Sequence, residues 1–334
     1  MSATQEPWPT LRLDAWQDTY QTLHMYTQVV GKVRLKLSPM INQWWQTPLY
    51  LAARGLSTSP IPYPSCDRTF EMRFDFLDHR LVIETYDGKV RSIALGGAVK
   101  DFYREVMEAL RGLGVEVRIW TMPVEVVDPI PFEQDDRHAT YDPVYAHRFW
   151  QVLRQADVVL KEFRGRFTGK SSPVHFFWGS FDLAVTRFSG RPAPPPEGTD
   201  LITRLGYNAE LSSVGFWPGG RGIQGEISGA AFYSYTYPAP SGLRDQPVRP
   251  DKAFYHDELG EFLLMYDDVR GSADPRSAIL DFAQSTYEAG ARLQGWPMAE
   301  LDLRQEEATA ATSQDPAAPP SELAASKAPN PQGT

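Results

Sequence analysis

The clearest pattern along the chain is the strict alternation of hydrophobic and charged or polar residues over Thr69–Phe76, where every second residue is Phe or Met. A period of two is typical of a β-strand with one buried face. Two further hydrophobic segments, Leu81–Thr85 and Val90–Leu95, flank Asp87-Gly88, a dipeptide that favours a tight hairpin turn. These three segments predict an antiparallel sheet.

Hydrophobic residues at helical spacing predict the main helices. One extends over Val99–Leu113; Asp14 precedes another over 15–30, and Asp142-Pro143 and Asp274-Pro275 begin two more. The other predicted strands cover residues 32–37, 48–55, 115–120, 181–188, 210–217, 230–237 and 261–266. Strands joined by short turns, with helices before and after them, indicate an α+β protein.

The chain also resembles itself. When it is shifted by 134 positions, residues 16–49 match residues 150–183 at nine positions, where average residue usage gives about two. Further along, a shift of 180 positions pairs the Asp-Phe dipeptide at 101–102 with the one at 281–282. Such self-similarity predicts two fused pseudo-repeats, each made of a helix, an antiparallel sheet of about four strands and a second helix. The seam between them is a natural place for a pocket.

The repeat divides the chain into four parts. The first pseudo-repeat covers 1–120, a linker rich in Pro and acidic residues covers 121–143, and the second pseudo-repeat covers 144–298 with longer loops. The tail, 299–334, is rich in Ala, Pro, Ser and Glu and contains no aromatic residue. A segment of this composition buries too little surface to offset the entropy of ordering, so we expect it to be disordered.

Composition narrows the class of protein. The 334 residues are 42% hydrophobic, as in a globular protein, and a net charge of −9 argues against binding to nucleic acid. Cys66 is the one cysteine, which excludes an intramolecular disulfide and fits a reducing compartment. The N-terminal residues lack the pattern of a signal peptide, and no hydrophobic run approaches the length of a membrane span. We expect a cytoplasmic monomer or homodimer without a membrane partner.

Two glycine-containing segments resemble nucleotide-binding motifs but lack features that those motifs require. Gly165–Ser172 resembles a phosphate-binding loop but has three residues instead of four before its Gly-Lys, and Gly220–Gly225 matches GxGxxG without a following helix. The histidines show no metal-binding spacing, so we expect no metal and no cofactor. A site assembled from His175, Asp182 and Glu210 is the one metal arrangement that the sequence leaves open.

The most unusual segment, Ser172–Arg191, places His175, Asp182 and Arg187 among many aromatic residues. Polar groups in such surroundings are either paired structurally or used chemically, because an unpaired buried polar group costs about 1–3 kcal/mol. His175 could transfer protons, Asp182 could orient it, and Arg187 could bind a carboxylate or phosphate. The alternative for each is a buried ion pair or hydrogen bond that stabilises the strands.

Further candidates lie on the neighbouring strands and in the first pseudo-repeat. Glu210 lies on the next predicted strand, and Tyr235 belongs to a row of tyrosines that forms either a wall for a polar ring or ordinary strand packing. Lys36 and Arg54 could face the second pseudo-repeat across the seam, although a basic strand face is usually just solvated. The candidate catalytic residues are His175, Asp182 and Glu210, and the candidate ligand-binding residues are Trp178, Arg187, Tyr235, Arg54 and Lys36.

Several long segments carry a family resemblance. LHMYTQVVGKVRLKLSP, WWQTPLYLAARGLSTSPIP, SPVHFFWGSFDLAVTRFSGR, SSVGFWPGG and ELGEFLLMYDDVR are similar to the bacterial domain-of-unknown-function family 5996. The resemblance covers about residues 8 to 298 and implies a soluble bacterial protein, without an activity, cofactor or catalytic residue to carry over. The chain departs from the expected pattern at Asn208-Ala209, where a His beside the Glu would be expected; this counts further against a metal.

These observations favour a protein that binds a small polar or anionic molecule in a pocket between the pseudo-repeats and that could also transform it. They do not decide whether the pocket is catalytic. The alternative is a non-catalytic interaction module that uses exposed aromatic residues as its contact surface.

Overall fold

The computed structural model describes residues 6–63, 67–223 and 225–303. In these ranges the α-helices are α1 (Leu13–Leu37), α2 (Val99–Gly112), α3 (Pro143–Gly165), α4 (Leu201–Gly206), α5 (Tyr266–Arg270), α6 (Pro275–Leu293) and α7 (Met298–Leu301), and the short 3₁₀ helices are η1 (Asn42–Trp44), η2 (Phe132–Gln134) and η3 (Leu243–Asp245). The strands are β1 (Tyr50–Ala52), β2 (Gly55–Ser57), β3 (Ile61–Tyr63), β4 (Arg68–Asp75), β5 (Arg80–Thr85), β6 (Val90–Ala94), β7 (His175–Phe177), β8 (Asp182–Pro192), β9 (Ala209–Trp217), β10 (Gly220–Gly222), β11 (Gly225–Ile227), β12 (Ala231–Tyr237), β13 (Phe254–His256) and β14 (Glu261–Met265).

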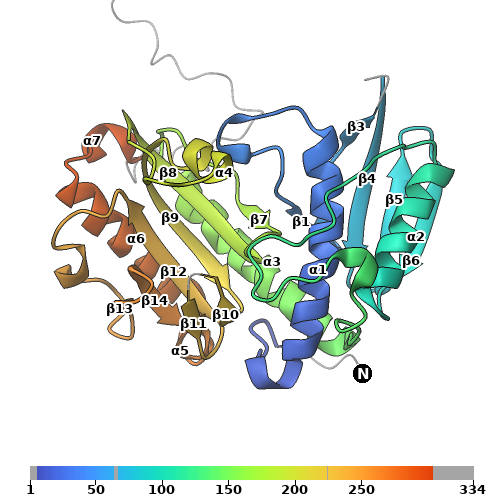
Figure 1. The fold of residues 1–334 in the computed structure, drawn as a ribbon. Helices are drawn as coiled ribbons and strands as arrows, with labels where there is room; N and C mark the ends of the chain where they lie inside the picture. The colour runs from blue at the N-terminus through green and yellow to red at the C-terminus, as the bar shows by residue number, and fades with distance from the viewer. Residues whose placement is uncertain (1–5, 64–66, 224, 304–334) are drawn as a thin grey trace, which may run out of the picture.

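The described strands form two antiparallel sheets of six strands each and a small β10–β11 hairpin (Figure 1). The first sheet has the order β1-β2-β4-β5-β6, with β3 paired to β4, and the second has the order β13-β14-β12-β9-β8-β7. A pair of backbone hydrogen bonds between Leu49 and Phe176, both 2.8 Å from N to O, joins the two sheets edge to edge. The protein is therefore an α+β protein, as its hydrophobic pattern predicts.

Helices α1 and α2 cover the first sheet. The alternation along β4 produces the predicted buried face, because Phe70, Met72 and Phe74 are at most 2% exposed. Tyr26 of α1 stacks on Phe102 of α2 with ring centroids 4.0 Å apart, and Phe102 also stacks on Phe74. The first sheet and its two helices thus form half of the hydrophobic core.

Helices α3 and α6 cover one face of the second sheet (Figure 1). Each begins as the sequence predicts, because Asp142 and Asp274 accept hydrogen bonds from the backbone at the start of their helices and a proline follows. Along β12, residues alternate between buried positions that face these helices and half-buried positions that face the other way. This other face of the second sheet is turned toward α1.

Three predicted strands are wrong in detail. Residues 32–37 continue α1, because nothing in them interrupts a helix before Ser38, whose position ahead of a proline disfavours helical geometry. Residues 48–55 contain β1, a turn and the start of β2 rather than one strand. Residues 115–120 form no strand, since no neighbouring strand pairs with them.

The order helix–sheet–helix occurs twice, first as α1, the first sheet and α2, then as α3, the second sheet and α6. Each described sheet has six strands rather than the expected four or so. The shared order agrees with the predicted duplication, which stays a prediction. The tail beyond Leu303 and Cys66 lie outside the described residues.

Candidate functional site

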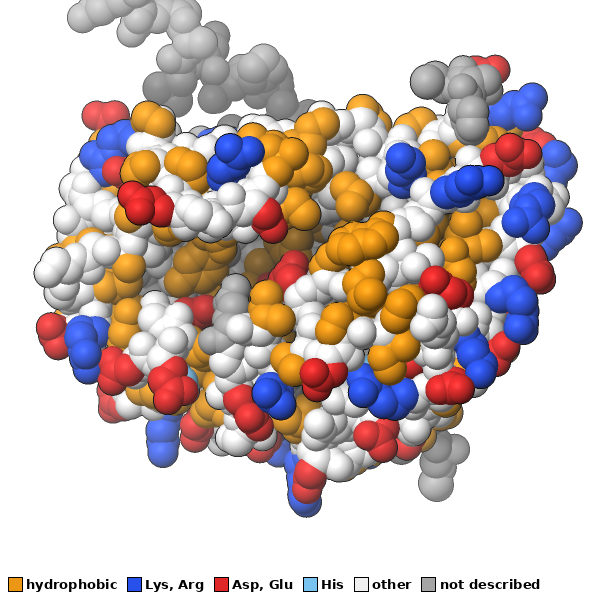
Figure 2. Space-filling view, in the orientation of Figure 1, with side chains coloured by type: hydrophobic (Ala, Val, Ile, Leu, Met, Phe, Trp, Pro, Cys, Tyr) orange, Lys and Arg blue, Asp and Glu red, His pale blue; other side chains and the backbone are white. Residues whose placement is uncertain are grey.

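A cleft of about 1190 Å³ separates α1 from the uncovered face of the second sheet. Its lining includes α1, η1 and residues 124–128 from the first half and linker, and α4, the β10–β11 hairpin and the sheet from the second half. Figure 2 shows this side of the molecule hollowed between the second sheet and α1, with hydrophobic and acidic side chains inside the hollow. The cleft therefore lies at the seam where the sequence analysis expects a pocket.

The floor of the cleft is formed by every second residue of four strands. These residues are Asp182, Ala184, Thr186 and Phe188 of β8, Leu211, Ser213 and Trp217 of β9, Tyr233 and Tyr235 of β12, and Glu261 and Leu263 of β14. Strand register aligns them, since Tyr235 pairs with Ser213, and Ser213 pairs with Thr186. The two hydroxyl oxygens of Thr186 and Ser213 are 3.0 Å apart.

Asp182 is the most enclosed acidic group of the floor, with 6% of the residue exposed. One carboxylate oxygen accepts a hydrogen bond from the Ser180 hydroxyl and the other accepts one from the Tyr233 hydroxyl. Burial raises the pKa of Asp182 above its usual range, although both hydrogen bonds oppose that effect. The cleft thus has a carboxylate at its base whose two oxygens are already oriented.

Two more carboxyl groups, Glu125 and Glu261, line the cleft near Asp182. Burial raises the pKa of Glu125 to about 7, with a smaller contribution from the charges of Asp182 and Asp200. Burial likewise raises the pKa of Glu261 to about 7, and Asp182 adds to the shift. Both groups therefore exchange protons near neutral pH, where catalytic acids and bases commonly work.

Glu125 comes from the segment that the sequence analysis treats as a linker. Gln28 of α1 binds this segment through both ends of its amide, donating to the Val124 carbonyl at 2.7 Å and accepting from the Val124 N–H at 2.9 Å. Glu125 itself has a left-handed backbone with φ of 55°, and its carboxyl lies against Gly179, where a Cβ atom would collide with it. Several independent features thus hold this carboxyl in the cleft.

Unusual backbone conformations concentrate around the cleft. Outside glycine, the described residues with positive φ are Gln43, Trp44, Ser59, His79, Glu125, Asp128 and Phe181. Four of these seven line the cleft, and a fifth, Phe181, immediately precedes Asp182. Because such conformations cost about 1–3 kcal/mol each and collect at functional sites, their distribution marks the cleft as the candidate site.

The α1 wall of the cleft carries Tyr20 and His24, whose rings stack. His24 is 8% exposed and its Nε2 donates to the Gly179 carbonyl at 2.8 Å. Burial lowers the pKa of His24 to about 4, so the ring is neutral. The contact with the Gly179 carbonyl places the proton of this neutral ring on Nε2.

The structure does not bring the predicted His175, Asp182, Arg187 and Glu210 together, which corrects the expectation that they share one pocket. Arg187 lies five positions after Asp182 on β8 and therefore faces α3 and α6. Its guanidinium is fully buried between Phe163 and Tyr287 and donates to the Phe163 carbonyl. Burial lowers the pKa of Arg187 to about 10.

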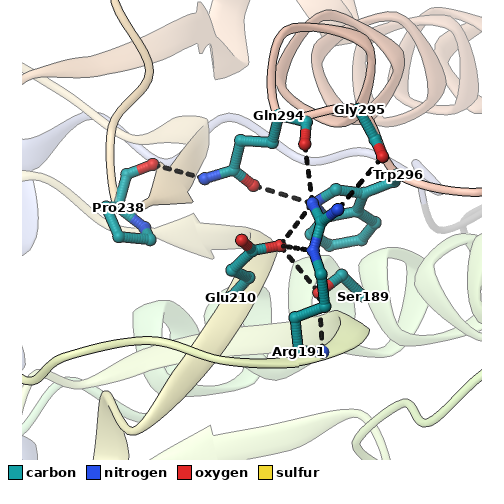
Figure 3. A network of polar contacts seen from close by, with 7 residues as sticks. All are labelled: Ser189, Arg191, Glu210, Pro238, Gln294, Gly295 and Trp296. Carbon is teal, nitrogen blue, oxygen red and sulfur yellow. Dashed lines mark hydrogen bonds and ion pairs between the residues drawn. The ribbon is translucent and has the colours of Figure 1, made fainter.

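Glu210 also lies on the helix-covered side of the second sheet (Figure 3). Its Oε2 accepts hydrogen bonds at 2.8 Å from the Ser189 hydroxyl and from Nε of Arg191. Arg191 in turn donates to the carbonyls of Gln294 and Gly295 just after α6. Glu210 therefore orients a cation that binds the carboxyl end of α6, a structural role.

His175 on β7 is fully buried beside the cleft rather than in it. The rings of Trp45, Tyr50 and Phe177 surround its imidazole, and neither ring nitrogen has a hydrogen-bond partner. Burial lowers the pKa of His175 to about 3, with the positive charges of nearby arginines adding to the shift. A proton-transfer role needs contact with solvent or a ligand, and this position provides none.

The remaining predicted residues divide between the cleft and the surface. Trp178 and Tyr235 line the cleft; Trp178 donates to the Thr47 carbonyl at 2.9 Å, and the Tyr235 hydroxyl lies 3.0 Å from that of Tyr207. Arg54 forms ion pairs with Asp75 and Asp78 at the turn after β4, away from the cleft. Lys36 is exposed at the end of α1 and is not a cleft residue.

Asp182, Trp178 and Tyr235 are thus the predicted residues that the cleft contains. Glu125 is not among the predicted site residues, because a Pro-rich segment without periodicity gives no sign that it folds back over a pocket. Glu261 is also absent from them, although that residue begins a predicted strand and shares the face of Leu263. Within the described residues, no group of three or more His, Cys, Asp or Glu side chains could hold a metal ion.

The fold and the cleft define an α+β protein with a deep polar and aromatic cleft between two helix–sheet–helix halves. The sequence model of the family described as "Family of unknown function (DUF5996)" matches residues 8–303, and the chain belongs to this family. Neither a curated protein nor a solved structure matches the chain. Among the described helices, none combines the length and the hydrophobicity that crossing a membrane requires.

Proposed function

We propose that the protein binds a small polar ring compound in the cleft between α1 and the second sheet. The observation that carries the proposal is the concentration of unusual backbone around one hollow: Gln43, Trp44, Glu125 and Asp128, which have positive φ, line the cleft. Phe181, which also has positive φ, immediately precedes Asp182 of the floor. Strain of this kind persists where the surrounding structure maintains it for a purpose other than stability.

The lining suits a ring with polar substituents. Tryptophan side chains from both halves, among them Trp44 and Trp217, offer flat apolar surfaces. Asp182, Glu261 and the Tyr207–Tyr235 hydroxyl pair offer hydrogen-bonding groups close to these surfaces. Aromatic walls with a few fixed polar groups are typical of small-molecule sites.

The alternative function, an interaction module with exposed aromatic residues, finds less support in the described residues. Their most exposed large aromatic side chains, Trp120, Tyr86 and Phe254, belong to three separate segments. Most other tryptophans are buried in the core or line the cleft. We also propose a cytoplasmic location, supported by the single cysteine.

A thermal-shift screen of neutral, cationic and anionic metabolites tests the proposal. We expect at least one compound to raise the melting temperature of the wild type and of Glu210→Gln, whose substituted carboxyl lies outside the cleft. The same compound should have a smaller effect on Asp182→Asn and on Tyr235→Phe, because both lose a polar group of the floor. A ligand at about 100 times its Kd stabilises a protein by about 2.7 kcal/mol, enough for a shift of a few degrees.

Two outcomes contradict the proposal. One is a screen in which no compound stabilises the wild type. The other is a compound that stabilises the wild type and both cleft variants equally, since it would then bind elsewhere. Because Tyr235→Phe removes a single oxygen, it serves as the second variant if Asp182→Asn does not fold.

A further inference from the structure

Most of the charged side chains that line the cleft are acidic. Six carboxyl side chains line it (Asp18, Glu125, Asp128, Asp182, Asp200 and Glu261), against two guanidinium groups, Arg137 and Arg221. Both arginines are exposed, and Arg137 donates to the backbone carbonyl of Asp128. The enclosed part of the cleft, around Asp182 and Glu261, therefore has negative groups without an opposite charge among its lining residues.

Three basic side chains next to the cleft already have hydrogen-bond partners. Lys32 donates to the Met122 carbonyl at 2.8 Å, and Arg34 donates to the Gln46 carbonyl at 2.7 Å. Lys170 donates to the Gln43 side chain at 2.8 Å and lies over the ring of Trp45. None of the three is a lining residue of the cleft, so they do not neutralise its floor.

We propose that the ligand of this cleft is a small organic cation, a compound with a protonated amine or a quaternary ammonium group. This inference rests on the proposed function of the cleft. It is supported by the carboxyls of the floor, above all by Asp182 and Glu261, which no cationic side chain of the floor accompanies. A ligand that carries a positive charge and donates hydrogen bonds to these carboxyls matches this arrangement.

The aromatic walls strengthen the inference. Trp44, Trp45, Trp178 and Trp217 line the cleft together with Tyr20 and Tyr233. The faces of such rings attract cations, and aromatic surroundings are a common way of binding ammonium groups. An anionic ligand, in contrast, would be repelled both by the faces of these rings and by the ionised carboxyls. The cations that the sequence predicts as anion-binding residues, Arg187, Arg54 and Lys36, lie outside the cleft.

The proposal has a pH dependence of defined sign. A cation binds the ionised carboxyls, so binding should strengthen as pH rises through the pKa of about 7 of Glu125 and Glu261. The other titratable and charged groups facing these carboxyls are Asp18, Tyr20 and His24 of α1, Asp128, Arg137 and His138 after Glu125, Asp182, Asp200, Tyr207, Arg221, Tyr233 and Tyr235. Among them, His24 is neutral near pH 7 and the tyrosines have raised pKa values because they are buried, so they stay uncharged.

The test titrates the full chain with three classes of probe and follows tryptophan fluorescence and calorimetry. The cationic probes are putrescine and tetramethylammonium, the neutral probes are myo-inositol and glucose, and the anionic probe is citrate. We expect a cationic probe to bind more tightly at pH 8 than at pH 6, by about tenfold for each of the two carboxyls that it contacts, because a carboxyl with a pKa near 7 changes from about one tenth ionised to about nine tenths. Both cationic probes keep their charge over this range.

Matched variants locate the binding. Glu261→Gln and Glu125→Gln each remove one carboxyl of the cleft and should weaken the cationic probe at pH 8 by about tenfold and flatten its pH dependence. Glu210→Gln makes the same chemical change on the other face of the second sheet and should leave binding unchanged. Thermal melts of all three variants confirm that each is folded before its affinity is compared.

The outcomes separate this inference from the proposed function. One outcome is that a neutral or anionic probe binds, that the cleft variants weaken its affinity, and that its affinity does not rise from pH 6 to pH 8. The cleft then binds small molecules and the cation inference is overturned. If a cationic probe binds but Glu261→Gln and Glu125→Gln leave its affinity intact, the inference is also overturned. If no probe of any class binds, both the inference and the proposed function lose their support.

Discussion

The face of a strand on which a side chain lies decides its chemistry in this protein. Asp182 and Arg187 are separated by an odd number of positions on β8, so one is in the cleft and the other is in the core between the sheet and its helices. The same alternation separates Glu210 from Ser213 on β9. Residue types that look equally functional in the sequence are therefore divided between binding and structure by a single position.

His175 should affect stability rather than binding. Its pKa is lowered to about 3 by burial, from an ordinary value of 6.5, so it contributes stability that is fully present above pH 6.5 and is lost as pH falls toward 3. We expect His175→Leu to be at least as stable as the wild type at pH 8, because it removes two unpartnered nitrogens. At pH 5 the free energy of unfolding of His175→Leu should exceed that of the wild type by a further amount, up to about 1.4 kcal/mol for each pH unit below 6.5.

Urea unfolding of both proteins at pH 5 and pH 8 measures this difference. If the free energy of unfolding falls by the same amount from pH 8 to pH 5 in His175→Leu and in the wild type, the prediction is contradicted. A ligand that binds the wild type and not this variant would show that His175 takes part in binding.

Arg187 provides a second prediction at this scale. Its guanidinium lies 3.5 Å from the centre of the Phe163 ring, and its Nε and Nη1 atoms have no partner. Because a buried charge pays a large desolvation cost, Arg187→Met should change the free energy of unfolding by less than about 1.5 kcal/mol, whereas Arg187→Ala should lower it by about 3–5 kcal/mol through the cavity that it leaves. Denaturant unfolding compares the two; a methionine variant as unstable as the alanine variant would show that the charge itself is required.

Individual elements show how close packing shapes the cleft. Helix α1 extends over 25 residues, and its Gly31 lies flat against the ring of Trp178, which also lines the cleft. Trp178 in turn donates to the Thr47 carbonyl ahead of β1. A helix of the first half and a loop of the second half are therefore in contact at a position where only glycine fits.

Gly31→Ala should destabilise the protein, because a Cβ atom at this position would collide with the ring of Trp178. Overpacking of this kind costs about 1–3 kcal/mol. The matched control is Gly112→Ala at the end of α2, where a Cβ atom would meet no other atom within 4 Å. There alanine should stabilise the helix by about 0.5–1 kcal/mol. Thermal melts of the two variants measure both effects, and equal shifts would contradict the packing argument.

The whole molecule has a hydrophobic core that extends through both halves. One cluster of buried residues includes Phe74 of the first sheet, Val30 of α1, Phe149 of α3 and Phe216 of the second sheet. The bridge between Leu49 and Phe176 adds backbone hydrogen bonds across the seam. The halves are therefore coupled even though each has its own sheet and helices.

This coupling predicts a single unfolding transition. Phe74→Leu in the first half and Phe216→Leu in the second should each lower the melting temperature of the whole protein, without a second transition appearing. Core substitutions of this size cost about 1–2 kcal/mol, or a few degrees for a chain of this length. Calorimetry of the wild type and both variants provides the measurement; two transitions that respond separately to the two substitutions would show that the halves unfold independently.

Much of the fold could be predicted from the sequence because its causes are local. The alternation over Thr69–Phe76, the hairpin around Asp87-Gly88 and the N-caps Asp142 and Asp274 act within a few residues of themselves. The predicted end of α1 failed because hydrophobic and basic residues at 32–37 fit a helix and a strand equally well. Without a partner strand, the helix continues to the residue before Ser38.

The sequence by itself determined the α+β class, the main helices and strands, and the presence of polar groups among aromatic residues at Asp182, Trp178 and Tyr235. Tertiary structure alone decided which polar residues meet. Glu125 reaches the cleft because a segment without periodicity is bound to Gln28 almost a hundred residues earlier, and Arg187 is excluded because α3 and α6 cover its face of the sheet. The physical reason is that periodicity encodes which residues share a face, whereas the element that covers this face is set by contacts between distant parts of the chain.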